Sequence, residues 1–443
     1  MGILPMKYEE RSGWGRNLKG YVRYQSLDEF TPQTGWQEQS GLPVGLGRSY
    51  GDSSLNLEGI SWNSSNLKNI AISVEESEAS CGAGVTIGEL ERFAESKGLF
   101  PPVVPGTEFV TIGGAIASNI HGKSHHSYGS FGDNLLEIEI LRTNGEKLKL
   151  FPTGDTSEHF WATVGGMGLT GAILSAKIKL IPITNSFMTV WERRVSNLEE
   201  MLKELQIMDS SNIYTVGWID LSGRFLGRGL VSGGNHSHNT ELKAPTNTKS
   251  NQLSRRSLPP LPPINFINKF SVRAFNEFWF RKPLREGIMH YRPFLHPLDG
   301  IVDWNKIYGP KGFVQYQFVI PFGEEDFIQM VMFELRKSGV ASFLGVLKKF
   351  GASDSRYLSF PKPGWTLAVD IPASLYGYQS LLNQFDSALC RIGGRVYLTK
   401  DSRLNKNHFQ KMYPGHDSWR DIKHALDPRN YWRSSQGMRL GLC

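Results

Sequence analysis

The chain has 443 residues, 40% hydrophobic and 21% charged, with a formal net charge of +7 and a pI near 9.1. This length favours two domains, and the composition is that of an ordinary globular protein. The basic charge suits an anionic substrate, a membrane surface or nucleic acid, but no basic stripe interleaved with aromatic residues supports nucleic-acid binding.

The sequence also bears on where the protein acts. No run of about 18 apolar residues occurs, so we expect no membrane-spanning helix. The N-terminus lacks the apolar core of a signal peptide. Cys81, Cys390 and Cys443 form no CxxC pair and indicate reduced thiols. We therefore expect a cytoplasmic protein.

The first predicted elements follow one another closely. Residues 71–84 predict a strand. Thr86 and Glu89 have the spacing of a capping box, which predicts a helix that ends at Gly98.

A hairpin is predicted next, because Asn144–Gly145 separates the apolar segments 135–141 and 147–150. Residues 157–164 predict a short helix, and residues 172–182 predict an alternating strand. Short hairpins mixed with short helices indicate an α+β fold rather than a doubly wound parallel sheet.

The character of the chain changes near residue 186. Aromatic-rich strands are predicted at 213–220 and 312–321. Between them, residues 232–263 are rich in Ser, Asn and Pro and predict a flexible loop.

Two glycine-rich segments indicate a cofactor site. In residues 43–52 the glycines do not match the dinucleotide fingerprint of a Rossmann fold, but successive amides of such a turn can cradle a pyrophosphate. The alternative is an ordinary surface turn. The second segment contains Gly113 and Gly114, where the absence of Cβ atoms lets a ligand approach the backbone.

Titratable residues stand beside these glycines. His121, Lys123, His125 and His126 follow the second segment, and their spacing matches no metal-binding motif. They indicate either catalysis or a solvated loop. Further along, Lys400–Asp401 ends a predicted strand, where an exposed ion pair is the simpler interpretation.

Taken in order, the segments resemble those of a known family. They are GLGRSYGD, PGT…VTIGGAIASNIHGKSHHSYGSFG, FWATVGGMGLTG, HPLD…WN…YGP, SFPKPGW and KDSR. The set is similar to FAD-dependent oxidoreductases of the vanillyl-alcohol oxidase type with a p-cresol-methylhydroxylase-like FAD domain. Within that group it resembles the oxidases of decaprenylphosphoryl-β-D-ribose, over nearly the whole chain.

The resemblance implies a domain organisation. Residues 1–185 would form the FAD-binding domain, to which residues 395–443 return. Residues 186–394 would form an antiparallel-sheet substrate domain with helices.

The resemblance also implies how FAD is held. FAD would be bound without a covalent link, because relatives that attach it through the first glycine turn have a histidine where this chain has Arg48. The residues implied to contact FAD are Pro43, Val44, Gly45, Leu46, Gly47, Arg48, Ser49, Tyr50, Gly51, Asp52, Ser53, Gly106, Thr111, Ile112, Gly113, Gly114, Ser118, Asn119, Ile120, His121, Ile173 and Tyr397.

Catalysis would belong to Lys400, His121 and Tyr50. Either Lys400 or His121 would take the hydroxyl proton, and the sequence leaves both open. Lys123 or Lys348 would bind the substrate phosphate. The residues implied to face the substrate are Lys123, Gln315, Gln317, Lys348, Leu295, Thr366 and Ala368. The last of these replaces a cysteine of the mycobacterial pattern that covalent inhibitors attack, and Leu295 and Thr366 replace a tyrosine and an asparagine.

The implied reaction is oxidation of the 2′-hydroxyl of a polyprenyl-phosphoryl-β-D-ribose to the 2′-ketone, the first half of a 2′-epimerisation in cell-envelope biosynthesis. An NAD(P)H-dependent short-chain reductase would complete it. The alternatives are oxidation of a soluble sugar, alditol or aldonolactone, and a flavin-free binding protein that retains the fold.

A predicted helix bears on the choice of substrate. Ile267, Phe270, Ala274 and Phe278 recur at helical spacing, downstream of Arg255 and Arg256. This helix would either admit a polyprenyl tail at the inner face of the plasma membrane or serve as a core helix.

Overall fold

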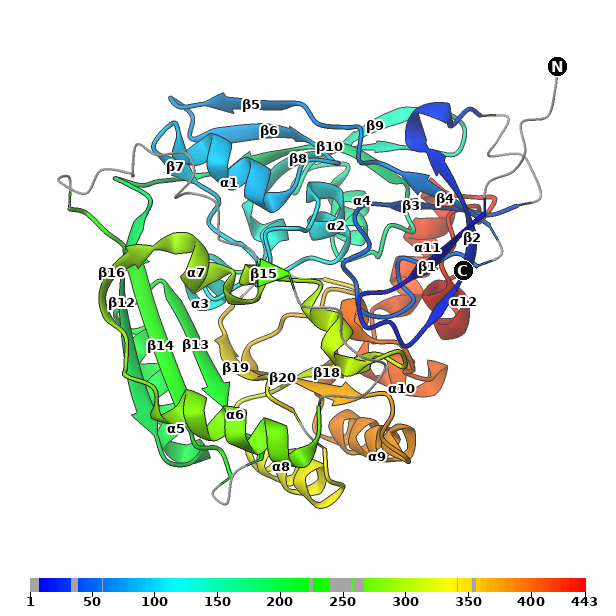
Figure 1. The fold of residues 1–443 in the computed structure, drawn as a ribbon. Helices are drawn as coiled ribbons and strands as arrows, with labels where there is room; N and C mark the ends of the chain where they lie inside the picture. The colour runs from blue at the N-terminus through cyan, green and yellow to red at the C-terminus, as the bar shows by residue number, and fades with distance from the viewer. Residues whose placement is uncertain are drawn as a thin grey trace.

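The computed structural model describes residues 8–32, 39–57, 59–222, 226–239, 256–257, 267–340, 342–352 and 356–443. Two smaller sheets lie at one end of the molecule and a large antiparallel sheet lies at the other (Figure 1). The α+β fold class predicted from the sequence is confirmed.

The first small sheet carries the first glycine turn. Its strands have the order β1 (Tyr8–Ser12), β2 (Lys19–Ser26), β4 (Ile60–Asn63) and β3 (Gly41–Val44). Both β2 and β3 pair with β4 in parallel. Because β3 ends at Val44, the turn that follows it begins at the edge of this sheet.

The second small sheet has five antiparallel strands, in the order β5 (Ile70–Ser73), β6 (Glu78–Gly82), β10 (Ala172–Lys179), β8 (Leu135–Leu141) and β9 (Lys147–Leu150). The single strand predicted at 71–84 is therefore wrong. A turn through Ser77, which has a positive φ of 53°, divides it into β5 and β6. The hairpin at Asn144–Gly145 is confirmed.

Four short helices accompany these sheets: α1 (Ile87–Glu95), α2 (Ile112–Ala117), α3 (His125–Tyr128) and α4 (Ser157–Thr163). The capping box predicted for α1 is confirmed. The Glu89 carboxylate accepts from the Thr86 amide at 2.7 Å, and the Thr86 hydroxyl accepts from the Glu89 amide at 3.1 Å. A short pair, β7 (Leu99–Phe100) with β11 (Ile181–Pro182), leads toward the large sheet.

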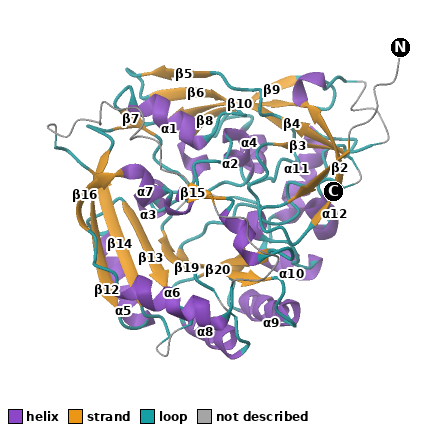
Figure 2. Ribbon diagram, in the orientation of Figure 1, coloured by secondary structure: helices purple, strands orange, loops and turns teal. Residues whose placement is uncertain are grey.

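The large sheet has eight strands, and all its pairings are antiparallel. Their order is β16 (Glu286–His290), β12 (Phe187–Val195), β14 (Gly229–His236), β13 (Tyr214–Ile219), β19 (Gly345–Phe350), β20 (Gly364–Pro372), β18 (Phe313–Ile320) and β21 (Arg395–Val396). Figure 2 shows α5 (Leu198–Asp209), α8 (Asp326–Lys337) and α9 (Tyr378–Arg391) on the side of this sheet away from β5 and β6.

Because successive side chains of a strand point to opposite faces, the residues of each strand divide between the two faces of the large sheet. On β13, a Cβ at Gly217 would lie 2.7 Å from Met201 Sδ of α5, so this position faces the helices. Its neighbours Val216 and Trp218 line an internal cavity. One face therefore forms the core with α5, and the other faces the cavity.

The loop predicted at 232–263 is wrong for its first residues. Positions 232–236 belong to β14, and the backbone of 256–257 forms β15 (Arg256–Ser257), which pairs with β17 (Ile301–Val302). Residues 240–255 and 258–266 lie outside the described residues. The predicted helix is confirmed as α6 (Lys269–Arg281), with Ile267 just before it.

The remaining elements connect the two ends of the molecule. They are the helix α7 (Tyr291–Leu295), the 3-10 helices η1 (Leu27–Glu29), η3 (Phe131–Asn134), η4 (Pro297–Gly300), η5 (Trp304–Tyr308) and η6 (Leu398–Lys400), and the C-terminal helices α10 (Lys406–Met412), α11 (His416–Leu426) and α12 (Ser435–Leu440).

The C-terminal segment touches both ends of the molecule. β21 pairs with β18 of the large sheet, and the Gly41 amide of β3 donates to Tyr431 O at 3.0 Å. The exact division at residues 185 and 394 stays a prediction.

Candidate functional site

A cavity of about 940 Å³ lies between the small sheets, the open face of the large sheet and α6. This volume is typical of a site for a cofactor or a large ligand. Most of the residues predicted for FAD, substrate and catalysis lie in its wall: Pro43, Val44, Gly45, Leu46, Gly47, Arg48, Ser49, Tyr50, Ser53, Gly106, Thr111, Gly113, Gly114, Ser118, Ile120, His121, Lys123, Ile173, Gln315, Gln317, Lys348, Ala368, Tyr397 and Lys400.

Four residues predicted to contact FAD lie outside this wall: Gly51, Asp52, Ile112 and Asn119. A Cβ at Gly51 would lie 1.8 Å from Asp401 O, so this glycine lets two backbone segments touch. The Ile112 side chain packs in the core beneath α2. Asn119 holds the chain by accepting from the Gly132 amide and donating to Ser359 Oγ, at 2.9 and 3.1 Å. In the structure these residues support the cradle, and their contact with FAD stays a prediction.

Two residues expected on the substrate side are also set back. Leu295 packs in the core and presents its carbonyl oxygen to the Lys123 amine at 2.9 Å. Thr366 lies behind Gln317, whose amide donates to its hydroxyl at 3.3 Å. The expectation that both side chains line the cavity is not met.

The glycines of the two predicted segments form a cradle that FAD would fit. Cβ atoms at Gly47 and Gly106 would enter open space in the cavity. Cβ atoms at Gly45 and Gly113 would instead lie 2.3 Å from Thr111 Oγ1 and 3.1 Å from Ala83 Cβ. The first pair leaves room for a ligand, and the second lets the backbone segments pack closely.

Arg48 stands in the wall of this cradle between two aromatic rings. Its guanidinium lies 4.2 Å from the centroid of the Trp14 ring and 5.6 Å from that of Phe109. Such stacking holds a planar cation in place. Arg48 therefore offers a fixed positive charge to an anionic group such as a pyrophosphate.

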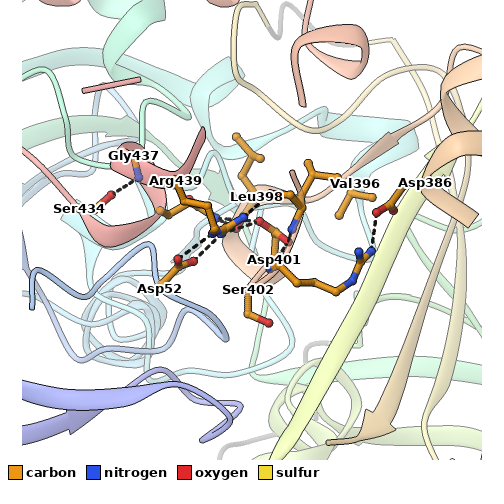
Figure 3. A network of polar contacts seen from close by, with 12 residues as sticks. Asp52, Asp386, Val396, Leu398, Asp401, Ser402, Ser434, Gly437 and Arg439 are labelled. Carbon is orange, nitrogen blue, oxygen red and sulfur yellow. Dashed lines mark hydrogen bonds and ion pairs between the residues drawn. The ribbon is translucent and has the colours of Figure 1, made fainter. Parts of the chain in front are cut away.

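Asp52 is part of an ionic network that fixes the first glycine turn (Figure 3). Arg439 of α12 donates to both Asp52 oxygens, at 3.0 and 2.7 Å, and to Asp401 Oδ2 at 2.9 Å. One guanidinium thus joins the turn to the residue after Lys400. Asp52 supports the cradle rather than lining it.

Three lysines face the cavity: Lys123 before α3, Lys348 on β19 and Lys400 at the end of η6. Removal from bulk water lowers the pKa of Lys123 to about 7, of Lys348 to about 8 and of Lys400 to about 7. The charge of Lys348 contributes to the lowered pKa of the other two. The cavity is therefore basic, and its amines titrate near neutrality.

His121 lies in the same wall, surrounded by the rings of Phe350, Phe360 and Tyr397. Burial, followed by the charge of Lys348, holds the pKa of His121 well below its usual range. Gln317 Nε2 lies 3.0 Å from His121 Nε2, while the Nδ1 atom has no hydrogen-bond partner within the described residues. Because the Gln317 amide donates to Nε2, the neutral ring carries its proton on Nδ1.

The rest of the wall is largely apolar. It is formed by Val216, Trp218, Leu230, Ile267, Val272, Phe275, Trp279, Phe294, Leu298, Ile301, Val302, Trp304, Ile307, Phe343, Leu344 and Val346. These residues come from β13, β14, α6 and neighbouring segments of the substrate side. The basic part and this apolar part share one cavity.

Sequence reasoning missed several residues of this site. Arg439 is separated from Asp52 by 387 positions, and no local pattern identifies it. The sequence could have identified Asp370, because it is the one charged residue in the apolar strand Gly364–Pro372. No sequence pattern identifies Trp218 and Trp279, because only the fold places this strand residue and this helix residue in the wall of one cavity.

Comparison with known proteins agrees with this geometry. An FAD binding domain family matches residues 34–151. The decaprenylphosphoryl-beta-D-ribose oxidase of Mycolicibacterium smegmatis is 36% identical over 457 residues, which cover 99% of each chain. A Streptomyces coelicolor protein described as lying in the mprA 5′ region is 30% identical, over 81% of this chain and 100% of its own.

A more distant similarity is confined to part of the chain. Berberine bridge enzyme-like 25 of Arabidopsis thaliana is 36% identical over 121 residues, which cover 27% of this chain and 22% of that protein. Within the described residues, no helix is long and apolar enough to cross a bilayer.

The glycine cradle, the matching FAD domain and the full-length relative all agree with the family that the sequence motifs resembled. The chain belongs to the family of decaprenylphosphoryl-β-D-ribose oxidase, and it is an FAD-dependent oxidoreductase.

Proposed function

We propose that this protein oxidises the 2′-hydroxyl of a polyprenyl-phosphoryl-β-D-ribose to the 2′-ketone. The observation that carries the proposal is a single cavity whose wall joins the glycine cradle, three lysines and an extended apolar surface. The full-length similarity to an oxidase named for this substrate supports it. Bound FAD supplies the acceptor for the hydride of the oxidised carbon.

Lys400 is the residue that we assign to the hydroxyl proton. With a pKa of about 7, a large share of its amine is unprotonated near neutrality and can accept that proton. His121 is less suited, because its Nε2 accepts from Gln317 and its Nδ1 already carries the proton. We assign to His121 the donation of a hydrogen bond to a substrate oxygen.

Tyr50 has a supporting role in this assignment. Burial, with the charge of Asp370, raises the pKa of Tyr50 well above its usual range. The phenol therefore stays protonated and does not act as a base. Its ring faces the Lys400 amine, 3.4 Å from the ring centroid, and so limits where that amine can lie.

Lys123 and Lys348 are the proposed phosphate ligands. Lys123 donates one hydrogen bond to Leu295 O and keeps further donors for a ligand. The Lys348 amine makes no hydrogen bond or ion pair with any other described residue. An ammonium group held away from water without a counter-charge is costly, and an anionic phosphate would offset that cost.

Helix α6 supports a lipid rather than a soluble substrate. Its side chains Val272, Phe275 and Trp279 line the cavity, whereas Phe270 and Phe278 are 87% and 70% exposed. Because only Val272 and Asn276 are buried on this helix, a core-helix interpretation suits it poorly. We propose that the inner side contacts the prenyl tail.

We further propose that the outer side of α6 contacts the membrane that carries the substrate. Lys269, Arg273 and Arg281 lie on the same helix as the exposed phenylalanines, a combination that suits anionic headgroups. The protein would then lie on the inner face of the plasma membrane.

Three further proposals accompany this function. FAD is held without a covalent bond, since the stacked Arg48 guanidinium occupies the position at which relatives use a histidine. Residues 1–185 with 395–443 form the FAD domain, and 186–394 form the substrate domain. An NAD(P)H-dependent short-chain reductase then reduces the ketone and completes the 2′-epimerisation.

The decisive experiment is anaerobic reduction of the purified yellow protein. Polyprenyl-phosphoryl-ribose is expected to bleach the flavin absorbance rapidly. The same titration is made with ribose, with ribose 5-phosphate and with an alditol. Bleaching by the soluble compounds alone would replace the lipid substrate with a soluble sugar, and a colourless protein would contradict catalysis by FAD.

A further inference from the structure

Asp370 is a buried carboxylate immediately behind the cavity wall. It lies on β20, a strand whose residues are all buried. Its Oδ1 accepts from Gln315 Nε2 at 2.6 Å, and its Oδ2 accepts from the Tyr308 hydroxyl at 3.1 Å. Two elements other than its own, β18 and η5, therefore fix its position.

The contacts of Asp370 lead toward the reacting groups. Gln315 lines the cavity and donates to Asp370. Burial raises the pKa of the Tyr50 phenol, and Gln315 lowers it. The ring of Tyr50 in turn faces the Lys400 amine at 3.4 Å. In the described part of the chain, Asp370 and Lys400 make no direct ion pair, so the carboxylate acts on the amine through this network and through its field.

The groups around Asp370 and Lys400 have opposite effects on the protonation of the Lys400 amine. Burial and the charge of Lys348 on β19 favour the neutral form of the Lys400 amine, whereas the Asp370 carboxylate favours its protonated form. Burial raises the pKa of Asp370 to about 7, while Gln315, Lys400 and Tyr308 oppose that rise. The charge of Asp299 raises the pKa of Tyr50, and that of Arg48 lowers it.

We propose that Asp370 is the positioning residue of the reaction: it orients Gln315 and Tyr50 against Lys400 and sets the charge state of the Lys400 amine. Without the carboxylate, burial and Lys348 would act on the amine unopposed. The amine would then lose its proton at lower pH, and the Gln315 amide would lose its anchor. This inference rests on the proposed role of Lys400.

A first test needs no substrate. The holoenzyme is labelled with acetic anhydride across a pH series, and acetylation of Lys400 is measured by peptide mass spectrometry relative to the exposed Lys411. In Asp370→Asn, the pH of half-maximal Lys400 labelling should fall by about one unit or more, because a nearby opposite charge changes a pKa by roughly 1–3 units. An unchanged midpoint overturns the proposal.

The chain offers a matched control in Asp386. It is also buried, and it also accepts from a tyrosine hydroxyl, that of Tyr316 at 3.1 Å, but it pairs with Arg403 at 2.7 Å rather than acting on Lys400. Asp386→Asn should destabilise the fold and leave the labelling midpoint of Lys400 unchanged. An equal fall in this control would mean that any buried charge loss has the same effect, and it would contradict a specific role of Asp370.

Tyr308→Phe keeps the test decisive if Asp370→Asn does not fold. This change keeps the carboxylate and removes one hydrogen bond that favours its charged form, so the midpoint should fall by a smaller amount. No fall in Tyr308→Phe, with Asp370→Asn unfolded, overturns the proposal.

The pH profile of flavin reduction is the second readout. In Asp370→Asn, the limb that belongs to Lys400 should move to lower pH together with the labelling midpoint. A uniform loss of rate without a shift would indicate a merely structural role and overturn the inference. If polyprenyl-phosphoryl-ribose does not reduce the flavin of the wild-type protein, the proposed substrate is wrong. The labelling result still decides the role of Asp370 in that case.

Discussion

The Lys400 amine lies 3.4 Å from the centroid of the Tyr50 ring, so a residue near the C-terminus meets one in the first glycine turn. A backbone hydrogen bond of 2.9 Å, from the Tyr50 amide to Thr399 O, holds the two segments in register. An ammonium group over an aromatic face is stabilised, whereas burial disfavours it. The reactivity of Lys400 depends on the balance between these two effects.

Replacement of Lys400 should separate cofactor binding from catalysis. Lys400→Met is expected to stay yellow while the rate of substrate-dependent flavin reduction falls by about 10²–10⁴-fold, the usual contribution of a general base. Stopped-flow absorbance under anaerobic conditions measures this rate. Lys411→Met, on the exposed side of α10, is the control and should reduce at the wild-type rate. Wild-type bleaching by Lys400→Met would remove Lys400 from the mechanism.

The rate should depend on pH in a stated direction. If the neutral amine of Lys400 is the base, flavin reduction rises with pH and reaches half its maximum near the pKa of about 7. The sign follows because raising the pH through that pKa removes the proton from the amine. A rate that falls as pH rises through 7 would mean that the protonated amine is required, and Lys400 would then orient the hydroxyl.

Adjacent lysines on β19 provide a test of phosphate binding. Lys348 faces the cavity, whereas Lys349 faces away and pairs with Asp209 at 3.4 Å. Lys348→Ala should raise the KM for the phosphorylated substrate by about 10–100-fold, the loss expected for a charge-assisted hydrogen bond of roughly 1.5–3 kcal/mol. Lys349→Ala should leave KM unchanged. Equal effects of the two variants would argue against a phosphate contact at Lys348.

Loss of Arg439 should weaken both the fold and the cofactor site. Arg439→Met leaves Asp52 and Asp401 without their shared guanidinium, and breaking a largely buried ionic network costs about 3–5 kcal/mol of unfolding free energy. Because Asp52 lies in the first glycine turn, FAD affinity should fall as well. Denaturant unfolding and flavin retention on gel filtration measure the two effects. Arg420→Met removes only the exposed pair with Asp417 and should change neither.

The exposed phenylalanines of α6 should affect binding and turnover only when a membrane or a long lipid is present. Phe270→Ser with Phe278→Ser is expected to reduce binding to vesicles that contain anionic phospholipid, because apolar area and basic charge act together at such surfaces. Turnover of a short-chain substrate analogue in solution should be unchanged. Tyr376→Ser, which removes another highly exposed ring outside the cavity wall, is the control, with unchanged vesicle binding expected. Vesicle binding by the double variant at wild-type strength would contradict a membrane contact through α6.

The local features of this protein could be predicted from the amino-acid sequence. The capping box at Thr86, the hairpin at Asn144–Gly145 and the two glycine segments depend on neighbouring residues, and short-range patterns identify them. The ordered motifs also identified the family, and the similarity to its named member extends over 99% of the chain. The turn at Ser77 was missed because its residues carry no Gly, Pro or Asn signal.

The contacts between these distant segments could not be predicted, because they form only when the chain folds. Arg439 reaches Asp52 across 387 positions, and Asp370 reaches the surroundings of Lys400 through Gln315 and Tyr50. The same packing set Leu295 and Thr366 behind the cavity wall and divided α6 between an inner and an exposed side. The pKa values of the buried lysines follow from that packing, because removal from water and proximity to other charges exist only once the chain has folded.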